Sequence, residues 1–212
     1  QERSGVPSTG DVDVASLEID ASRLGAPIQS TMYGVFFEDI NFGADGGLYA
    51  ELIKNRSFEF PQPLVGWVPF GQVEVKTDRP CFDRNPHYVS ITNDGRNEGF
   101  RGIGLKEGRE YCFSAYVRSR DDKPMTLSVE LVNRGGENPL KKDIKIRGNE
   151  WQKITARLTS PFTDTHSRLR IVLKNRGTVD MDHISLFPAD TWKGRENGLR
   201  KDLAQALYDL NP

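Results

Sequence analysis

The stretch Tyr111-Cys112-Phe113-Ser114-Ala115-Tyr116-Val117 has the two-residue period of a β-strand with one face in a core. The same period recurs on both sides of it, in residues 73–76, 88–92, 127–131, 144–146, 151–158, 169–173 and 181–186. Gly, Asn, Asp and Pro residues separate these stretches, as they do in two-sheet proteins. We therefore expect a mainly β chain in which residues 56–188 form a jelly-roll β-sandwich of about eight or nine short strands.

The region before the sandwich has a different pattern. Residues 1–14 are rich in Ser, Gly and Asp and predict a flexible lead-in, whereas residues 32–37 form a nearly continuous apolar run. Such a run is typical of a strand that is buried on both faces in a parallel sheet. After Asp45, a good helix N-cap, Leu48 and Leu52 lie at helical spacing. Residues 15–55 thus predict one strand followed by one helix.

The region after the sandwich predicts another helix within residues 189–212. Asn197 is its candidate N-cap, and Leu199, Leu203 and Leu210 lie on one apolar stripe. A strand buried in a parallel sheet needs parallel neighbours, and a closed (β/α)8 barrel takes roughly 250 residues. We therefore expect the two flanking regions to form a partial strand–helix unit of such a barrel, with its last helix truncated.

Composition excludes several classes of function. The chain has 29 Lys and Arg residues against 30 Asp and Glu, so nothing in its net charge favours binding to nucleic acid or to an anionic membrane. No apolar run approaches the roughly 18 residues needed to cross a bilayer. The two cysteines, Cys81 and Cys112, are either one disulfide bridge or two separate thiols, and the sequence leaves both alternatives open.

Two blocks carry a resemblance to a known family. The first is Tyr33-Gly-Val-Phe-Phe-Glu-Asp-Ile-Asn41 with the following residues 45–60, and the second is residues 190–207. In the same order, they resemble the α-L-arabinofuranosidases of glycoside hydrolase family 51. The resemblance implies a retaining enzyme that removes terminal arabinofuranosyl groups from arabinoxylan or arabinan. It also implies that residues 56–188 are an inserted sandwich of the galactose-binding or carbohydrate-binding-module type.

The resemblance assigns sugar contacts but no catalysis to this chain. A retaining mechanism uses two carboxylates roughly 5 Å apart, and both family glutamates lie on later barrel strands than those matched here. We therefore expect no catalytic residue and no hydrolysis by this chain alone. Glu38 occupies the family position at the C-terminal end of the first barrel strand, so it is a candidate substrate-binding residue, together with Asn41. Without the resemblance, the sequence pattern predicts that Glu38 and Asp39 form a solvated strand end.

Aromatic residues in the predicted sandwich are candidate glycan platforms, because sugar-binding modules stack aromatic rings on the C–H face of a sugar. Tyr88 lies beside His87 at a junction between a polar loop and a strand, which favours a surface position. Trp67, which follows a turn glycine, is a second candidate. The alternative for both residues, and for Trp151, is that they fill the core, where aromatic rings contribute much of the buried area.

A calcium site is a further expectation from resemblance. The stretch around Glu59 and the one around Asp182 resemble the first and last strands of carbohydrate-binding modules in families 4, 9 and 22, which often hold a structural Ca²⁺ there. Carboxylates suit this hard cation. Glu59 and Asp182 are the matching residues, with Asp180 as a third candidate. Otherwise these carboxylates face Arg side chains or water, and no cofactor is required.

The function expected from the sequence is that of an N-terminal fragment of a secreted or periplasmic arabinofuranosidase. Its expected partners are plant cell-wall polysaccharide and the remainder of the catalytic barrel, with no nucleic acid and no membrane. Two alternatives stay open at this stage. One is a stand-alone carbohydrate-binding module, and the other is a structural sandwich without a ligand.

Overall fold

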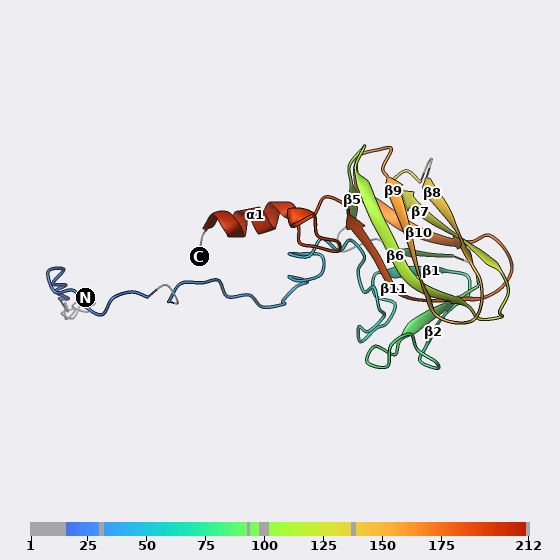
Figure 1. The fold of residues 1–212 in the computed structure, drawn as a ribbon, viewed down its shortest axis with the longest axis horizontal. Helices are drawn as coiled ribbons and strands as arrows, with labels where there is room; N and C mark the ends of the chain where they lie inside the picture. Colours follow the sequence, from blue (N-terminus) through green and yellow to red (C-terminus); the bar gives the residue numbers. More distant parts are fainter. Residues whose placement is uncertain (1–15, 30–31, 93, 98–101, 137–138, 211–212) are drawn as a thin grey trace, which may run out of the picture. The chain divides into compact units, whose positions relative to one another are not determined.

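The computed structural model describes residues 16–29, 32–92, 94–97, 102–136 and 139–210 (Figure 1). Residues 1–36 and residues 37–212 form two units, each of which is described by itself. The described part of the first unit contains a turn in which Arg23 N–H donates to the Asp20 carbonyl, and it contains no strand. The predicted lead-in, residues 1–14, lies outside the described residues.

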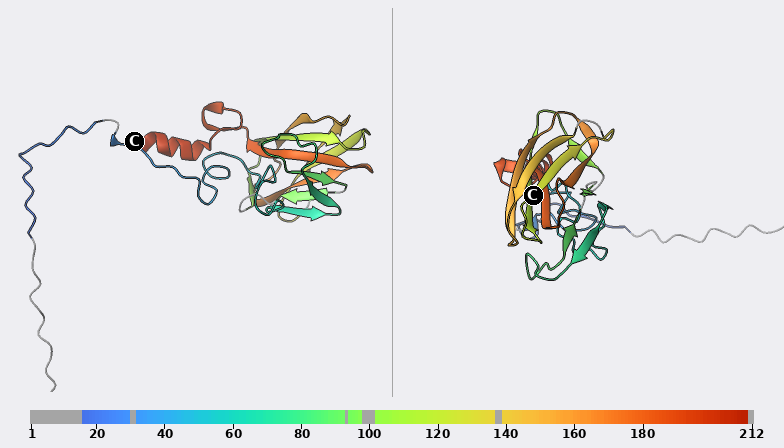
Figure 2. Two further views of the ribbon diagram at one scale, coloured as in Figure 1. Left: turned by 90° about the horizontal axis from the view of Figure 1, so that it is seen from below. Right: turned by 90° about the vertical axis from the view of Figure 1, so that its right-hand side faces the viewer.

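The second unit is a sandwich of two antiparallel sheets, which Figure 2 shows as facing layers. The six-stranded sheet has the order β1-β4-β10-β7-β8, with β5 paired to β10, and the five-stranded sheet has the order β2-β3-β11-β6-β9. The strands are β1 (Trp67–Phe70), β2 (Val73–Lys76), β3 (Tyr88–Ile91), β4 (Asp94–Asn97), β5 (Ile103–Leu105), β6 (Glu110–Ser119), β7 (Met125–Val132), β8 (Leu140–Ile146), β9 (Gln152–Thr159), β10 (Asp164–Leu173) and β11 (Val179–Pro188). The predicted sandwich is confirmed.

Alternation along the strands builds the core between the sheets. In β6, Phe113, Ala115 and Val117 are buried on the inner side, and in β7, Leu127 and Val129 face them from the other sheet. Every second side chain of β6 and β9 is thereby left on the outer face of the five-stranded sheet. The period seen in the sequence thus fixes which residues can meet a ligand on that face.

A bulge in β11 changes which residues face the core. Asp182 pairs with Tyr116, but Ser185 is the next residue of β11 to pair with β6, opposite Ser114. His183 is therefore the extra residue, and its φ of 45° lies in the left-handed region. Before the bulge Met181 points inward, and after it Ile184 and Leu186 do.

The predicted barrel strand at residues 32–37 is not formed in this structure. The segment has no assigned strand, and Tyr33, Phe36 and Phe37 are exposed. A strand buried on both faces requires hydrogen-bonded neighbours, and no strand of the described residues pairs with this segment. The prediction was therefore wrong for this chain as it is folded here.

The predicted helix after Asp45 is also absent from the structure, which has turns there. The backbone N–H groups that a helix would use internally are hydrogen bonded elsewhere: Ala50 N–H donates to the Gly198 carbonyl and Leu52 N–H to that of Leu186. Tertiary hydrogen bonds to β11 and to the segment after it therefore replace the helical ones. The periodicity of Leu48 and Leu52 predicted the wrong local structure.

The predicted C-terminal helix is present as α1 (Lys201–Leu210), preceded by a short 3-10 turn, η2 (Trp192–Gly194). It begins later than an Asn197 cap implied, because Asn197 has a left-handed φ of 49° and lies in the connecting loop. Ala204 is its buried residue, whereas Tyr208 and Leu210 are exposed. No further strand–helix unit of a barrel occurs among the described residues.

Candidate functional site

The outer face of the five-stranded sheet carries charged, hydroxyl and aromatic side chains that are not part of the core. These side chains come from alternate positions of the strands, including Ser90 from β3, Arg118 and Tyr116 from β6, Asp180 from β11 and Thr155 from β9. Part of this face is covered by loop 77–87, which connects β2 to β3. The covered and uncovered parts differ in their chemistry.

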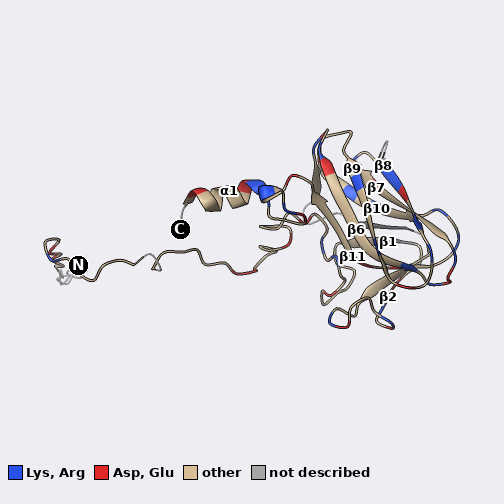
Figure 3. Ribbon diagram, in the orientation of Figure 1, with Lys and Arg blue, Asp and Glu red and all other residues tan. Residues whose placement is uncertain are grey.

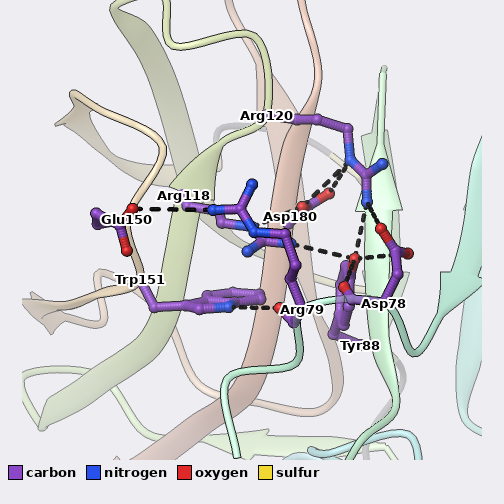
Figure 4. Close-up of polar contacts among 8 residues, drawn as sticks. All are labelled: Asp78, Arg79, Tyr88, Arg118, Arg120, Glu150, Trp151 and Asp180. Carbon is purple, nitrogen blue, oxygen red and sulfur yellow. Dashed lines mark hydrogen bonds and ion pairs between the residues drawn. The ribbon is translucent and has the colours of Figure 1, made fainter.

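Under the loop lies a network of buried charges, shown in Figure 4. Asp180 has no exposed surface and accepts hydrogen bonds from Arg118 Nε at 2.8 Å and from Arg120 Nε at 3.1 Å. Arg118 is itself almost fully buried. Two guanidinium groups around one carboxylate satisfy its charge within the protein, so this cluster holds the three central strands of the sheet to the loop.

Tyr88 is part of this network. Its hydroxyl donates to the Asp78 carbonyl at 2.6 Å and accepts from Arg120 Nη2 at 2.7 Å. The ring has no exposed surface, because Trp151 meets it edge-on with 5.3 Å between the centroids. Tyr88 therefore cannot stack on a sugar in this structure, and its predicted place on the surface was wrong.

The two tryptophans considered in the sequence also have internal partners. Trp67 is partly buried against the core, lies 5.4 Å from Phe58 between ring centroids, and donates its indole N–H to the Asn55 carbonyl. Trp151 is half-buried and donates to the Arg79 carbonyl at 3.0 Å (Figure 4). The guanidinium of Arg118 lies 4.6 Å from the Trp151 ring centre. These contacts support the alternative that both tryptophans pack inside the protein and do not form a platform for a sugar.

The middle of the loop is fixed by an aromatic contact. The Phe82 ring lies edge-on to Tyr116 at 5.0 Å and to His183 at 4.7 Å between centroids. Beside it, burial and the charge of Asp182 raise the pKa of Cys81 to about 12, so this thiol stays protonated. Cys81 and Cys112 are both free, so the alternative of two thiols holds and the disulfide does not.

The uncovered parts of the outer face form two clefts. One lies over β2 and β3, has a volume of about 220 Å³ and is lined by polar side chains that include Glu74, Lys76 and Ser90. The other lies over β6 and β9 and has a volume of about 560 Å³. We call the second one the β6–β9 cleft, and it is lined by Cys112, Phe113, Ser114, Lys142, Thr155, Ala156, Arg157, Phe187, Pro188, Ala189, Gly194, Arg195, Glu196 and Asn197. Hydroxyl, amide and charged groups of this kind are the ones that bind sugar hydroxyls.

The three predicted calcium ligands are placed differently from one another. Asp180 is engaged by Arg118 and Arg120, so it does not fit a metal site. Asp182 is fully buried with one carboxylate oxygen that accepts no hydrogen bond from the described residues and lies 4.0 Å from His183 Nε2, and burial together with the charge of Glu59 raises its pKa to about 7. Glu59 is engaged by His87 through both oxygens, since one accepts from the backbone N–H and the other lies 2.6 Å from the ring Nδ1. Two carboxylates near one another and a free buried oxygen fit a hard cation, although no group of three His, Cys, Asp or Glu side chains in the described part of the chain is arranged to hold one.

Glu38 and Asn41, the predicted substrate contacts, are exposed in the segment before the sandwich. Glu38 accepts through its carbonyl from Ile40 N–H, and Asn41 has a left-handed φ of 54°. Neither residue lines a cleft described above, and their assignment to sugar binding stays a prediction.

Glu51 is a buried carboxylate that the sequence did not indicate as a candidate. It is buried, accepts from Ile53 N–H at 3.0 Å and from Leu186 N–H at 2.9 Å, and burial raises its pKa to about 7. It holds segment 51–56 on β11. Glu51 was not expected to be buried, because the residues after Asp45 were predicted to form an amphipathic surface helix, on which a glutamate is usually solvated.

Comparison with known proteins identifies the sandwich. A family model described as a carbohydrate binding domain, of families 4 and 9, matches residues 50–178. The chain is 39% identical to an extracellular exo-α-L-arabinofuranosidase of Streptomyces chartreusis, over 95% of this chain and 25% of that protein. It is 34% identical to α-L-arabinofuranosidase 1 of Arabidopsis thaliana, over 93% of this chain and 32% of that protein. The chain thus spans a quarter to a third of the length of these relatives.

Solved structures that resemble this chain agree with these sequence relatives. An arabinose-bound α-L-arabinofuranosidase, MgGH51, matches 85% of this chain and 33% of its own with a TM-score of 0.76 and 29% identity. The CBM22-1 xylan-binding domain of Paenibacillus barcinonensis Xyn10C matches 70% of this chain and 99% of its own with a TM-score of 0.50 and 14% identity, which supports the fold alone. No helix in the described part of the chain is both long and apolar enough to cross a membrane. The resemblance to family 51 arabinofuranosidases is confirmed, and the chain belongs to the carbohydrate-binding domain family.

Proposed function

We propose that this chain is the carbohydrate-binding part of a secreted α-L-arabinofuranosidase, and that its ligand is arabinoxylan, arabinan or their oligosaccharides. The observation that carries the proposal is the match of residues 50–178 to a carbohydrate binding domain within a chain whose relatives are arabinofuranosidases. The relative from Streptomyces chartreusis is described as extracellular, which supports secretion. Hydrolysis is assigned to a catalytic barrel that would adjoin the segment carrying Glu38 and Asn41.

The β6–β9 cleft is the part of the outer face best suited to hold a glycan. It is open, whereas the aromatic rings under loop 77–87 are in contact with one another. Its floor offers the hydroxyls of Ser114 and Thr155, and its rim offers the Asn197 amide. Side chains of this kind bind sugar hydroxyls both as donors and as acceptors.

Calorimetric titration of the whole chain with arabinoxylan and arabinan oligosaccharides tests this proposal. Thr155→Trp places a large ring on the cleft floor and is expected to weaken binding at least tenfold, about 1.4 kcal/mol. Thr159→Trp is the matched control, since Thr159 is exposed on the same strand but does not line the cleft. Absence of binding by the unaltered chain would favour a structural sandwich without a ligand. Equal loss in both variants would remove the cleft from the proposal.

We also propose a structural Ca²⁺ held by Glu59 and Asp182, with Asp180 excluded by its two arginines. When bound, the cation would neutralise the buried Asp182 carboxylate and supply the partner that its second oxygen lacks. The proposal predicts one calcium per chain in elemental analysis and a lower melting temperature in the presence of a chelator. A melting curve that is the same with and without the chelator, in protein free of metal, contradicts it.

A further inference from the structure

The β6–β9 cleft has a wall that is rigid before any ligand arrives. In the loop after β11, Trp192 N–H donates to the Leu199 carbonyl and Gly194 N–H to that of Thr191, and the Thr191 hydroxyl donates to the Arg195 carbonyl. A Cβ on Gly198 would lie 2.7 Å from the Arg195 carbonyl oxygen, so a larger residue does not fit there. A wall fixed in this way avoids the entropy cost of ordering a loop when a ligand binds.

Salt bridges attach this wall to the body of the unit. Asp190 lies 3.2 Å from Arg109 Nη1, at the start of β6, and 3.1 Å from Lys201 Nζ, at the start of α1. These contacts are exposed and contribute little to stability on their own. They restrict the position of the loop relative to the strand that forms the cleft floor.

The charges in the cleft do not cancel. Arg157 is ion-paired with Glu110, whose hydrogen bond and charge raise the pKa of Arg157. Lys142 and Arg195 also line the cleft, and neither has a carboxylate within ion-pair distance among the described residues. Figure 3 shows Lys and Arg on β8 and β9, the two strands at this edge of the sandwich. The cleft therefore has an excess of positive charge beside hydroxyl and amide groups.

We infer that the β6–β9 cleft selects a glycan that carries a carboxylate, such as a uronic acid side group, with Lys142 and Arg195 as its contacts. The inference rests on the proposed carbohydrate binding and adds the class of sugar. A neutral glycan uses hydroxyl, amide and paired charged groups, which the cleft supplies in Ser114, Thr155, Asn197 and Arg157. Lys142 and Arg195, which form no ion pair with any described residue and are opposed in the cleft lining by the single carboxylate of Glu196, leave a net positive charge that adds a preference only for a ligand with negative charge.

The experiment compares one oligosaccharide in two forms. The whole chain is titrated calorimetrically, at low salt, with a glucuronic-acid-substituted xylo-oligosaccharide and with the same compound after reduction of its carboxyl group. We expect the acidic form to bind about tenfold more tightly, and we expect added salt to remove most of that difference. The double variant Lys142→Gln with Arg195→Gln is expected to bind both forms equally, with the affinity that the unaltered chain has for the neutral form.

Lys145→Gln is the matched control, because Lys145 is exposed on the same strand as Lys142 but does not line the cleft. It is expected to keep the preference for the acidic form. A chain that binds both forms equally well refutes the charge selection and leaves carbohydrate binding intact, whereas a chain that binds neither form refutes both. Loss of the preference in Lys145→Gln as well assigns it to the overall field and overturns the site. Melting curves confirm that all variants are folded.

Discussion

The two parts of the outer sheet face use the same residue types in opposite ways. Under loop 77–87, Arg118, Arg120 and Asp180 satisfy one another, and the rings of Tyr88 and Trp151 are in mutual contact. In the β6–β9 cleft, Lys142 and Arg195 face open space. Buried charges that are paired are costly to remove, whereas exposed charges cost little to remove and remain free to bind. The comparison teaches that one face of a sheet can have its charges paired and buried at one end and open to solvent at the other.

The largest effect on stability is expected from a substitution in the buried charge network under loop 77–87. Asp180→Asn leaves Arg118 buried without a carboxylate, so the free energy of unfolding should fall by about 3–5 kcal/mol. Denaturant unfolding followed by circular dichroism measures the loss. Asp143→Asn, an exposed change on β8, is the control and should stay within about 0.5 kcal/mol. A loss below about 1 kcal/mol in Asp180→Asn would mean that the network contributes little.

Glu51 sharpens the comparison, since it is a buried carboxylate whose nearest cation, Arg56, is 3.9 Å away. Burial raises its pKa from 4.5 to about 7. Between these two values Glu51 binds a proton more often in the folded state than in the unfolded state, so the stability that Glu51 contributes is greatest below pH 4.5 and is lost as the pH rises to about 7. The expected loss is on the order of 3 kcal/mol.

Glu51→Gln should remove the share of the pH dependence that Glu51 contributes and leave that of Asp182, because an amide keeps the acceptor for Leu186 N–H and does not titrate. Unfolding curves from pH 4 to pH 8 for both proteins supply the measurement. The idea fails if the two proteins lose stability in parallel across that range.

A smaller effect is expected from loosening the loop. Phe82→Ala removes two edge-on ring contacts and should cost about 1–2 kcal/mol. It should also expose Cys81, so this thiol should react faster with a thiol reagent. The measurement is made in a Cys112→Ser background, and Phe82→Tyr, which keeps the ring, is the control. An unchanged labelling rate would show that Phe82 does not fix the part of the loop that carries Cys81.

The smallest effect on stability is expected in the open cleft. Lys142→Gln should change the free energy of unfolding by less than about 0.5 kcal/mol, because the side chain is exposed and has no ion-pair partner in the described part of the chain. The same variant should weaken binding of the uronic-acid oligosaccharide. A large loss of stability would mean that the cleft, like the covered part, is structural.

The sequence predicted the sandwich well because its strands alternate across a single core. Residues 127–131 and 169–173, for example, lie within β7 and β10. β4 was missed, because Asp94-Gly95-Arg96-Asn97 has no apolar period and is a strand only through its pairing with β1 and β10. The flanking strand and helix were predicted wrongly, since the local pattern does not reveal where backbone groups find their hydrogen-bond partners.

The candidate site was predicted from the sequence less well than the fold. Tyr88 was expected on the surface because it adjoins a polar loop, but that loop folds back over it and Asp78 binds its hydroxyl. The sequence did not indicate Arg118, and it indicated Asp180 only as a third candidate calcium ligand. Their pairing depends on the register of β6 against β11, in which Asp180 lies opposite Arg118. Register between strands distant in the sequence is a tertiary property.

The extra residue in β11 has a consequence for any rearrangement of this region. The first half of the strand pairs with β3, whereas beyond His183 the N–H groups of Ile184 and Leu186 bond to the Arg56 carbonyl and to Glu51. Deleting this single position would keep Ile184 and Leu186 inward, because Asp182 would then be followed directly by Ile184 in regular alternation, but it would remove the local bend that the bulge gives the strand. The attachment of residues 51–56 to β11 is therefore expected to depend on the local bend at His183, and not on the inward or outward direction of the side chains that follow it.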